Sequence, residues 1–133
     1  MGDLTEHFSL AEFRCKDGTP TPPEAVENLE GTAAMLEALR AALAARYGRE
    51  CALIVLSGYR SPTYNDKVGG ASKSMHLVGK AADVTSPCYS PEQVQAVAFE
   101  LQDEGLVGGV GVYQTFTHVD TGRTRTWKGG FTG

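Results

Sequence analysis

The sequence predicts an α+β domain, with a small antiparallel sheet packed against two or three helices. Three observations support this class: a long amphipathic helical pattern in the first half, short strand-like segments bunched in the second half, and one further helical pattern between them. Helices and strands that are segregated in this way indicate α+β rather than alternating α/β structure. At 133 residues the chain is long enough for one hydrophobic core, so we expect a single domain over 1–133.

Three segments are expected to be helical. A short helix is expected to begin near Ser9, where a capping-box pattern precedes an apolar residue. The main helix is expected over 23–47, because apolar residues recur there at three-to-four spacing and a glycine follows as a stop. Another helix is expected over 91–104, between a serine cap and a glycine terminator.

The remaining elements are expected to be strands joined by turns. Short apolar, branched runs predict strands at 52–57 and 80–86. Between them, 58–75 is polar and glycine-rich, and we expect a long loop that is either functional or disordered. The C-terminal part is expected to form an antiparallel meander from the segments 108–115, 116–122 and 123–129.

Charge and hydropathy exclude several classes of partner. The net charge is −4 and the basic residues are scattered, so the sequence has no electrostatic footprint for nucleic acid or an anionic membrane. It has no apolar stretch long enough to span a membrane and no visible secretory signal. We therefore expect a monomer without nucleic-acid partners or membrane insertion.

The three cysteines, Cys15, Cys51 and Cys88, are few, odd in number and widely spaced. This pattern argues against a disulfide framework and against a cysteine zinc site. Buried, unpaired thiols are the favoured interpretation, with a single disulfide between two of the three as the alternative.

Two histidines and two aspartates are the candidate site residues. Side chains alternate along a strand, so His118 and Asp120 point to one face, and Asp83 on another strand can be aimed at the same point. His76 precedes a turn expected at Gly79, which can bring it back beside Asp83. Two histidines and a carboxylate suit zinc, and three protein ligands leave a position for water, as in catalytic zinc sites. For each residue alone, an exposed or hydrogen-bonded structural role is the alternative.

Three segments occur in the order HFSLAEFRCKDG, LSGYRSPTYNDKVGGASKSMHLVGKAADV and GGVGVYQTFTHVDTGRTRTW. In the middle segment SxHxxGxAxD follows GYRSP, a combination far more specific than the bare histidine–aspartate spacing. Together they resemble the zinc D-Ala-D-Ala carboxypeptidases and the related bacterial and phage peptidoglycan endopeptidases, the LAS-type metallopeptidases. The resemblance implies a zinc peptidase with one zinc ion per chain, carried on the small sheet.

The resemblance also implies roles for individual residues. His76, Asp83 and His118 match the three zinc ligands of the family. Arg60 matches an arginine that positions the substrate and stabilises the oxyanion at the scissile carbonyl, with a structural salt bridge as its alternative. Ser74 matches a residue that borders the substrate, and a hydrogen bond within the turn is the alternative for it.

The sequence departs from the family at the position of the general base. Many relatives have Glu or His three residues before the last zinc histidine, whereas this chain has Thr115, which cannot act as a base near neutral pH. Asp120 is the best substitute, because it shares a strand face with His118 and a nearby metal can tune it. The alternative for Asp120 is a hydrogen bond that orients a histidine ligand.

Three further residues are expected to have structural roles. His7 lies in the N-terminal lead-in and is expected to be exposed or packed against the domain. Tyr113 and Trp127 are expected to be packing residues rather than reactants.

The expected function is hydrolysis of an amide bond next to a D-amino acid in peptidoglycan stem peptides, by water that zinc activates. The bond is open between D-Ala-D-Ala at a free carboxyl end, a D,D cross-link and L-Ala-D-Glu. A carboxypeptidase needs a cation for the terminal carboxylate, and Arg60, Lys73 and Lys80 are the candidates. The alternative function is a non-catalytic, zinc-containing module of the same fold that binds the cell wall or a protein.

The expected place of action is the cell wall. Because no export signal is visible, a phage lysin that stays in the cytoplasm until it is released would reconcile the sequence with that substrate. A virion-borne enzyme or a trimmed chain would also do so, but a phage or prophage lysin is the favoured interpretation.

Overall fold

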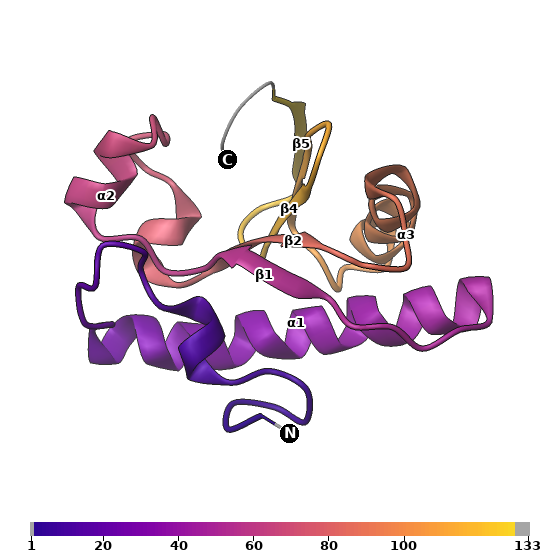
Figure 1. Cartoon of the computed structure of the whole chain (residues 1–133). Coiled ribbons are helices and arrows are strands. Elements are labelled where there is room, and N and C mark those ends of the chain that lie inside the picture. The colour runs from indigo at the N-terminus through magenta and orange to yellow at the C-terminus, as the bar shows by residue number, and fades with distance from the viewer. Residues whose placement is uncertain (1, 130–133) are drawn as a thin grey trace.

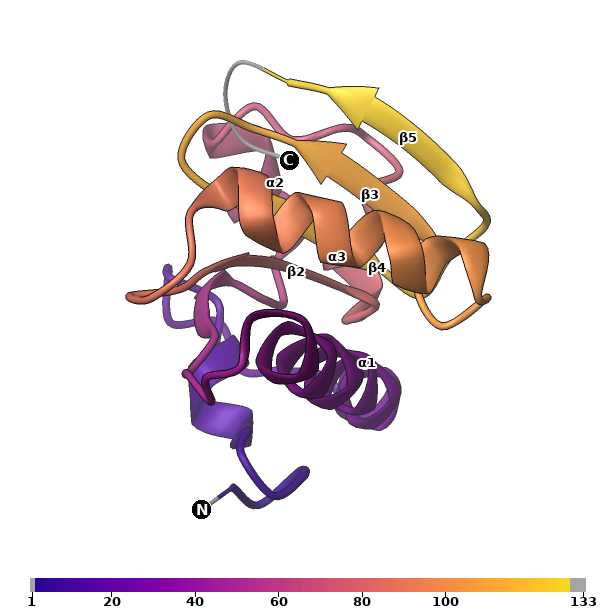
Figure 2. The same ribbon diagram turned by 90° about the vertical axis from the view of Figure 1, so that its right-hand side faces the viewer.

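The computed structural model describes residues 2–129 and confirms the α+β class. Three α-helices, two short 3₁₀ helices and five strands follow one another in the order η1 (Leu10–Phe13), α1 (Pro23–Tyr47), β1 (Ile54–Ser57), α2 (Pro62–Lys67), η2 (Met75–Val78), β2 (Ala81–Thr85), α3 (Pro91–Asp103), β3 (Gly109–Val112), β4 (Thr117–Asp120) and β5 (Arg125–Lys128). In Figure 1 the long helix α1 runs beneath the sheet and α3 lies to the right of it, and Figure 2 shows α3 in front of the strands with α1 seen nearly end-on below them.

The predicted helices are confirmed, and one more helix occurs where a loop was expected. α2 lies inside the segment 58–75. Its first turn begins at Pro62, and the side chain of Ser61 accepts a hydrogen bond of 3.1 Å from the backbone N–H of Tyr64. Serine followed by proline is a helix-start signal, so the prediction of an uninterrupted loop was wrong for a reason that is readable in the sequence.

The sheet has the order β1-β2-β4-β3-β5. Its neighbours are antiparallel, except that β5 pairs with β3 in parallel. The predicted meander was therefore right for β3 and β4 and wrong for β5. β2 and β3 already occupy the two edges of β4. β5 therefore pairs with the outer edge of β3 and runs parallel to it.

One face of the sheet is apolar and meets the helices. Val110, Val119 and Ala82 are cross-strand neighbours on this face, and none of them is exposed. They form one buried core with the apolar stripes of α1 and α3. Since strand side chains alternate, the residues between them point to the opposite face, away from α1 and α3.

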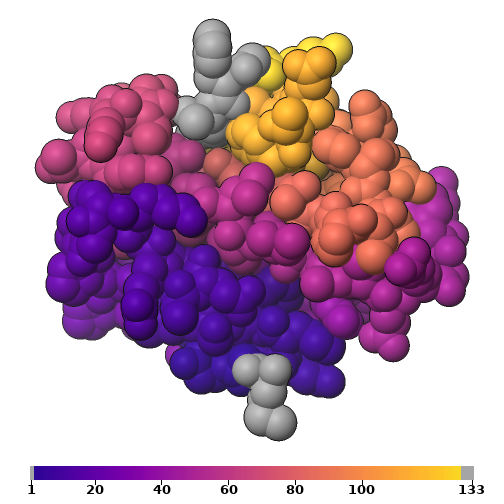
Figure 3. Space-filling model, viewed as in Figure 1, coloured from indigo at the N-terminus to yellow at the C-terminus, as the bar shows by residue number. Residues whose placement is uncertain are grey.

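That opposite face lies between the segment 58–79 and the C-terminal strands. In the space-filling view these two parts lie at the upper left (pink) and upper right (yellow), and the N-terminal residues (indigo) cover the lower part of the molecule (Figure 3). The described residues contain no helix that is long and apolar enough to cross a membrane.

Cys51 and Cys88 form a disulfide, and Cys15 is a buried free thiol. The favoured prediction of three unpaired thiols was therefore wrong for two of them. The bond ties the residues just before β1 to the β2–α3 connection, which the sequence spacing of 37 residues did not reveal.

Candidate active site

A row of side chains crosses all five strands on the face away from the helices. Following the register from the β1 edge to the β5 edge, the neighbours are Ser57, Asp83, His118, Gly111 and Trp127. The predicted positions of His118 and Asp83 on one face are thus correct, and they are directly opposite each other. The contacts of Ser57, His118 and Trp127 that are described below depend on that register.

A β-bulge places Ser57 in the row. Val55 pairs with Val84 on the core face, but the next pair is Ser57 with Asp83, so Leu56 is an extra residue on β1. Without the extra residue, Ser57 would share the core face with Val55. Bulges next to active sites commonly re-aim a side chain in this way.

His76 reaches the row from a turn rather than from a strand. It lies in η2, which ends at Gly79 with a left-handed φ of 75°. A Cβ at Gly79 would lie 2.6 Å from the carbonyl oxygen of Ala25, so only glycine fits against α1. The Thr32 hydroxyl donates a hydrogen bond of 2.7 Å to the Gly79 carbonyl, and the turn expected at this glycine is fixed to the long helix.

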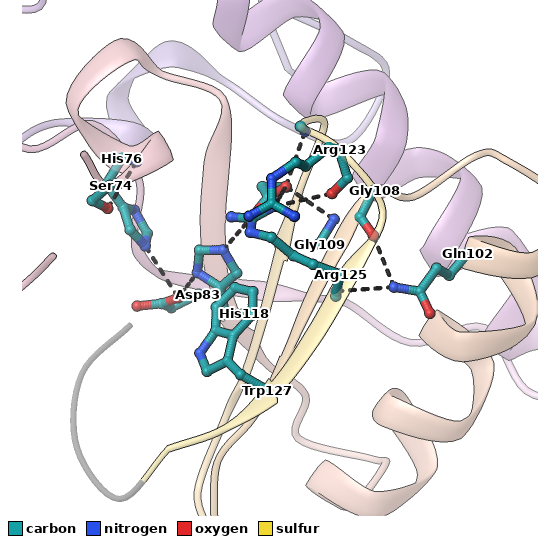
Figure 4. A network of polar contacts seen from close by, with 12 residues as sticks. Ser74, His76, Asp83, Gln102, Gly108, Gly109, His118, Arg123, Arg125 and Trp127 are labelled. Atoms are coloured by element: carbon teal, nitrogen blue, oxygen red, sulfur yellow. Dashed lines mark hydrogen bonds and ion pairs between the residues drawn. The ribbon is translucent and has the colours of Figure 1, made fainter.

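The three sequence-predicted ligands converge on one buried point. Oδ1 of Asp83 lies 3.2 Å from Nε2 of His76 and 3.0 Å from Nδ1 of His118. One ligand atom from each residue lies within 4.8 Å of the other two, and all three side chains are buried. Figure 4 shows the two imidazoles on either side of the Asp83 carboxylate.

The outer nitrogen of each imidazole fixes which inner nitrogen carries a lone pair. Nδ1 of His76 lies 2.7 Å from the Gly58 carbonyl oxygen, which can only accept, so Nδ1–H donates and Nε2 is unprotonated. Nε2 of His118 lies 2.7 Å from Oδ2 of Asp120, so Nε2–H donates and Nδ1 carries the lone pair of the neutral ring. Two nitrogen lone pairs and a carboxylate therefore face one another, which suits a divalent cation such as zinc.

The surroundings of Asp83 keep its carboxylate ionised. Burial alone raises the pKa of Asp83, but the imidazoles of His76 and His118 beside it hold that pKa well below its usual range. Burial lowers the pKa of His76 and favours its neutral form. For His118 the burial effect is outweighed by hydrogen bonds to Asp120 and Asp83, which raise its pKa. Zinc binds an ionised carboxylate and neutral imidazoles, so its binding would displace a proton from His118.

Asp120 lies behind His118, on the side away from the other two ligands. Besides the imidazole, it accepts hydrogen bonds of 2.9 Å from the backbone N–H groups of Gly109 and Gly122. Arg125 donates two more, of 3.0 and 2.8 Å, one to each carboxylate oxygen. Both oxygens of this unexposed carboxylate are thus engaged. The geometry favours the alternative interpretation of Asp120, an orienting partner of the histidine, over a proton acceptor for water.

Arg60 is buried beside the same cluster. Its guanidinium donates from Nη2 to Oδ2 of Asp83 at 3.2 Å, from Nη1 to Oδ1 of Asn65 at 3.3 Å, and from Nε to the Ser57 hydroxyl at 3.1 Å. It therefore forms the salt bridge considered as its alternative role. Because it also lines a cavity at the cluster, a contact with substrate is compatible with that salt bridge.

Ser74 and Thr115 lie in different surroundings. The Ser74 hydroxyl accepts a hydrogen bond of 3.2 Å from the backbone N–H of His76, and it also lines a cavity next to His118. Both interpretations of Ser74 thus hold geometrically. Thr115 is exposed in the β3–β4 connection and does not line the cavities described next.

Two cavities adjoin the cluster. The smaller, of about 160 Å³, has Asp83 and Arg60 in its wall together with apolar side chains from Leu56, Tyr64, Val68 and Phe116. The larger, of about 570 Å³, has His118 in its wall together with Lys73, Ser74, Tyr113, Arg125 and Trp127. Among the described residues the two cavities have no lining residue in common. A peptide lying over the cluster would therefore find space on both sides of the ligands.

Trp127, expected to be a packing residue, packs against the ligand cluster itself and lines the larger cavity. Its ring centroid lies 4.8 Å from that of His118. A Cβ on Gly111, its neighbour in the row, would lie 2.7 Å from the indole carbons, so glycine is what lets the ring approach the sheet. A glycine inside a strand is a known sign of close approach, and this signal was present in the sequence.

Comparisons of the sequence with known proteins also point to a peptidase. The chain is similar to a protein of Haemophilus influenzae named probable peptidoglycan L,D-endopeptidase MepK, with 40% identity over 88 residues. The aligned part covers 61% of this chain and 45% of that protein, so the chain spans about half the length of the relative it matches.

The sequence pattern of the family described as Peptidase M15 matches residues 6–120. This range contains all three converging ligands as well as Arg60, Ser74 and Asp120. The resemblance that the sequence motifs carry is thus confirmed at the level of the family, and the chain belongs to the M15 peptidases.

Proposed function

We propose that the protein is a zinc-dependent peptidoglycan endopeptidase that hydrolyses an amide bond between residues of L and D configuration. The observation that carries this proposal is the set of two imidazole lone pairs and one ionised carboxylate that face one buried point. Membership of the M15 family and the printed name of the relative support the reaction and the substrate.

The metal would be held by Nε2 of His76, a carboxylate oxygen of Asp83 and Nδ1 of His118. Bound there, zinc supplies a Lewis acid that acidifies water and polarises the scissile carbonyl. The chain contributes the orientation of its ligands: the Gly58 carbonyl fixes the ring of His76, and Asp120 fixes the ring of His118. Such outer partners hold ligands in place and raise their basicity.

Arg60 is proposed to position the substrate and to stabilise the oxyanion, as the resemblance implies. Its permanently charged guanidinium lies in the wall of the smaller cavity and is held there by Asp83, Asn65 and Ser57. A donor that is fixed before the substrate arrives needs no reorganisation during the reaction.

Asp120 is proposed to orient His118 rather than to take the proton of the attacking water. Its two oxygens accept five hydrogen bonds, including the one from the imidazole, and it lies in the wall of neither cavity. Among the described residues that line the two cavities, Asp83 is the only acid.

We favour an endopeptidase over a carboxypeptidase because a separate cavity lies on each side of the ligand cluster. A peptide chain could therefore continue in both directions from the cleaved bond. Within the smaller cavity the lining cation is Arg60, whose charge is compensated by Asp83 at 3.2 Å. Arg125, in the larger cavity, is likewise paired with Asp120 at 2.8 Å. A terminal carboxylate at either arginine would have to compete with these ion pairs, whereas a continuing peptide chain would not. Lys73, which also lines the larger cavity, is the cation that a carboxypeptidase would use instead.

Action on the cell wall, outside the reducing cytosol, remains the proposed localisation. The Cys51–Cys88 disulfide supports it, because disulfides persist mainly in oxidising surroundings. A lysin released from a host cell would meet such surroundings when it reaches the wall.

Mass spectrometry of purified peptidoglycan after digestion tests the function and identifies the bond. Wild type should release fragments with a new amine terminus at one kind of L,D bond. His76→Ala should release none. His7→Ala is the control and should retain the full rate, because His7 pairs with Glu37 and lines neither cavity. Release of free D-Ala alone would point to a carboxypeptidase, and a zinc-loaded wild type that releases no amine would contradict the proposal.

A further inference from the structure

Tyr113 lies directly after β3, between the larger cavity and the ring of Phe116. It is 6% exposed and lines the larger cavity together with His118. Its ring stacks on that of Phe116, with the centroids 4.3 Å apart and the planes 12° from parallel. Phe116 lines the smaller cavity together with Asp83. The stacked pair therefore has one ring in the wall of each cavity, beside the metal ligands.

The Tyr113 hydroxyl is held by Trp127. The indole Nε1 donates a hydrogen bond of 3.0 Å to the phenolic oxygen. An indole N–H cannot accept, so the phenolic oxygen is the acceptor in this contact and its own proton points elsewhere.

The Trp127 ring in turn packs against three neighbouring residues. The imidazole of His118 lies 4.8 Å from it, the Arg125 guanidinium carbon lies 4.9 Å from the ring centroid, and Gly111 lies beneath it. The hydroxyl of Tyr113 is thus hydrogen-bonded to an indole ring that itself packs against the metal ligand His118. A hydrogen-bond donor held in this way is preorganised.

The surroundings keep Tyr113 protonated at neutral pH. Burial raises the pKa of its phenol, the hydrogen bond from Trp127 opposes this, the charge of Asp83 adds to the rise, and that of Arg60 opposes it. The phenol is therefore a donor and not a base.

We propose that the Tyr113 hydroxyl donates a hydrogen bond to the oxyanion at the scissile carbonyl, from the side of the larger cavity. Arg60 lines the smaller cavity, so the oxyanion would meet a donor from each side. The phenol keeps its proton throughout, and no bond to Tyr113 forms or breaks. This inference rests on the proposed function and adds a catalytic residue to it.

Tyr113→Phe tests the proposal, because it removes one oxygen and keeps the ring that stacks on Phe116. The loss of one oxyanion donor should lower kcat by about 10²–10³-fold, with KM changed by less than about threefold. Affinity for a phosphinate peptide, whose tetrahedral oxygens resemble the oxyanion, should fall by about the same factor as kcat. Zinc content and Tm should stay at the wild-type values.

Tyr47→Phe is the matched control. Tyr47 ends α1 and packs against the tilted ring of Tyr89, in the wall of neither cavity, so all five measurements should equal those of wild type. An unchanged kcat and phosphinate affinity in Tyr113→Phe would overturn the proposal. A variant that loses zinc would overturn it too, because the hydroxyl would then support the metal site instead.

Trp127→Phe separates the donor from the group that holds it. The variant keeps a ring beside His118 but has no N–H for the phenol, so it should lower kcat less than Tyr113→Phe does. The double variant should be no slower than Tyr113→Phe alone, since the two residues act as one unit. Losses that multiply would contradict this coupling.

The outcomes for the two proposals are distinguishable. If zinc-loaded wild type cleaves peptidoglycan and Tyr113→Phe is equally fast, the Tyr113 proposal alone fails. If wild type cleaves nothing, the proposed function fails, and the phosphinate affinities of the two proteins still decide the role of the hydroxyl.

Discussion

His118 on β4 and Asp83 on β2 are direct cross-strand neighbours, with Nδ1 of the imidazole 3.0 Å from Oδ1 of the carboxylate. A slip of β4 by one residue against β2 would turn His118 to the core face and leave Asp83 without its partner. The apolar neighbours Val119 and Ala82, which are buried against the helices, resist that slip. The register that builds the core therefore also builds the candidate metal site.

Asp83→Asn should affect both metal binding and the stability of the metal-free protein. Zinc affinity should fall by at least about 100-fold, because the ligand loses its charge. Unfolding should become easier by about 3–5 kcal/mol, because the buried Arg60 loses its counter-charge. Zinc titration and urea unfolding measure the two effects, and Asp66→Asn, an exposed acid on α2, is the control that should show neither. A stable Asp83→Asn that binds zinc normally would contradict the site.

Asp120→Asn distinguishes orientation of His118 from base catalysis. If Asp120 orients the ring, zinc affinity should fall by about 10–100-fold, and much of the activity should return at saturating zinc. If Asp120 were the base, zinc affinity would stay normal and kcat would fall at every zinc concentration. Zinc titrations followed by rate measurements on the same samples separate the two.

The stability of the metal-free protein should fall in acid because of Asp120. Burial alone raises the pKa of this carboxyl, but hydrogen bonds from His118 and Arg125 hold the pKa well below its usual range. A group with a lowered pKa in the folded state contributes stability above its ordinary pKa of about 4, and that contribution is lost as the pH falls further. Urea unfolding between pH 6 and pH 3 should therefore show a steeper decline for wild type than for Asp120→Asn. Parallel declines would contradict this.

Gly111→Ala should displace Trp127. The added Cβ would lie 2.7 Å from the indole, so the ring has to move, at a cost of about 1–3 kcal/mol. Trp127 is the single tryptophan, so its fluorescence reports the displacement directly. Gly31→Ala is the control: it lies exposed in α1, a Cβ there meets nothing within 4 Å, and the variant should be more stable by about 0.5–1 kcal/mol. Unchanged fluorescence in Gly111→Ala would count against the role of this row.

The convergence of His76, Asp83 and His118 was predictable because each step is local. Alternation along β2 and β4 sets the face, and the turn at Gly79 returns His76 to it. Helix ends were predictable for the same reason, since caps and stops act within one turn of the chain. The choice of zinc rested on the resemblance and on the ligand types.

What the sequence did not reveal depends on partners far along the chain. The parallel pairing of β5 follows from β2 occupying the edge of β4, which no local pattern records. The bulge at Leu56 is likewise defined only by the pairing of β1 with β2. For Trp127 the signal was present as Gly111 on the opposite strand, but the pairing is needed to connect the two.

A stepwise return of zinc to metal-free protein tests the central claim most directly. The rate at which new amine termini appear in peptidoglycan should rise in proportion to added zinc and level off at one ion per chain. The same titration of His118→Ala should give no activity at any ratio. Hydrolysis that persists without metal would contradict the account, as would a chain that binds one zinc ion and releases no amine termini, the behaviour of a non-catalytic binding module.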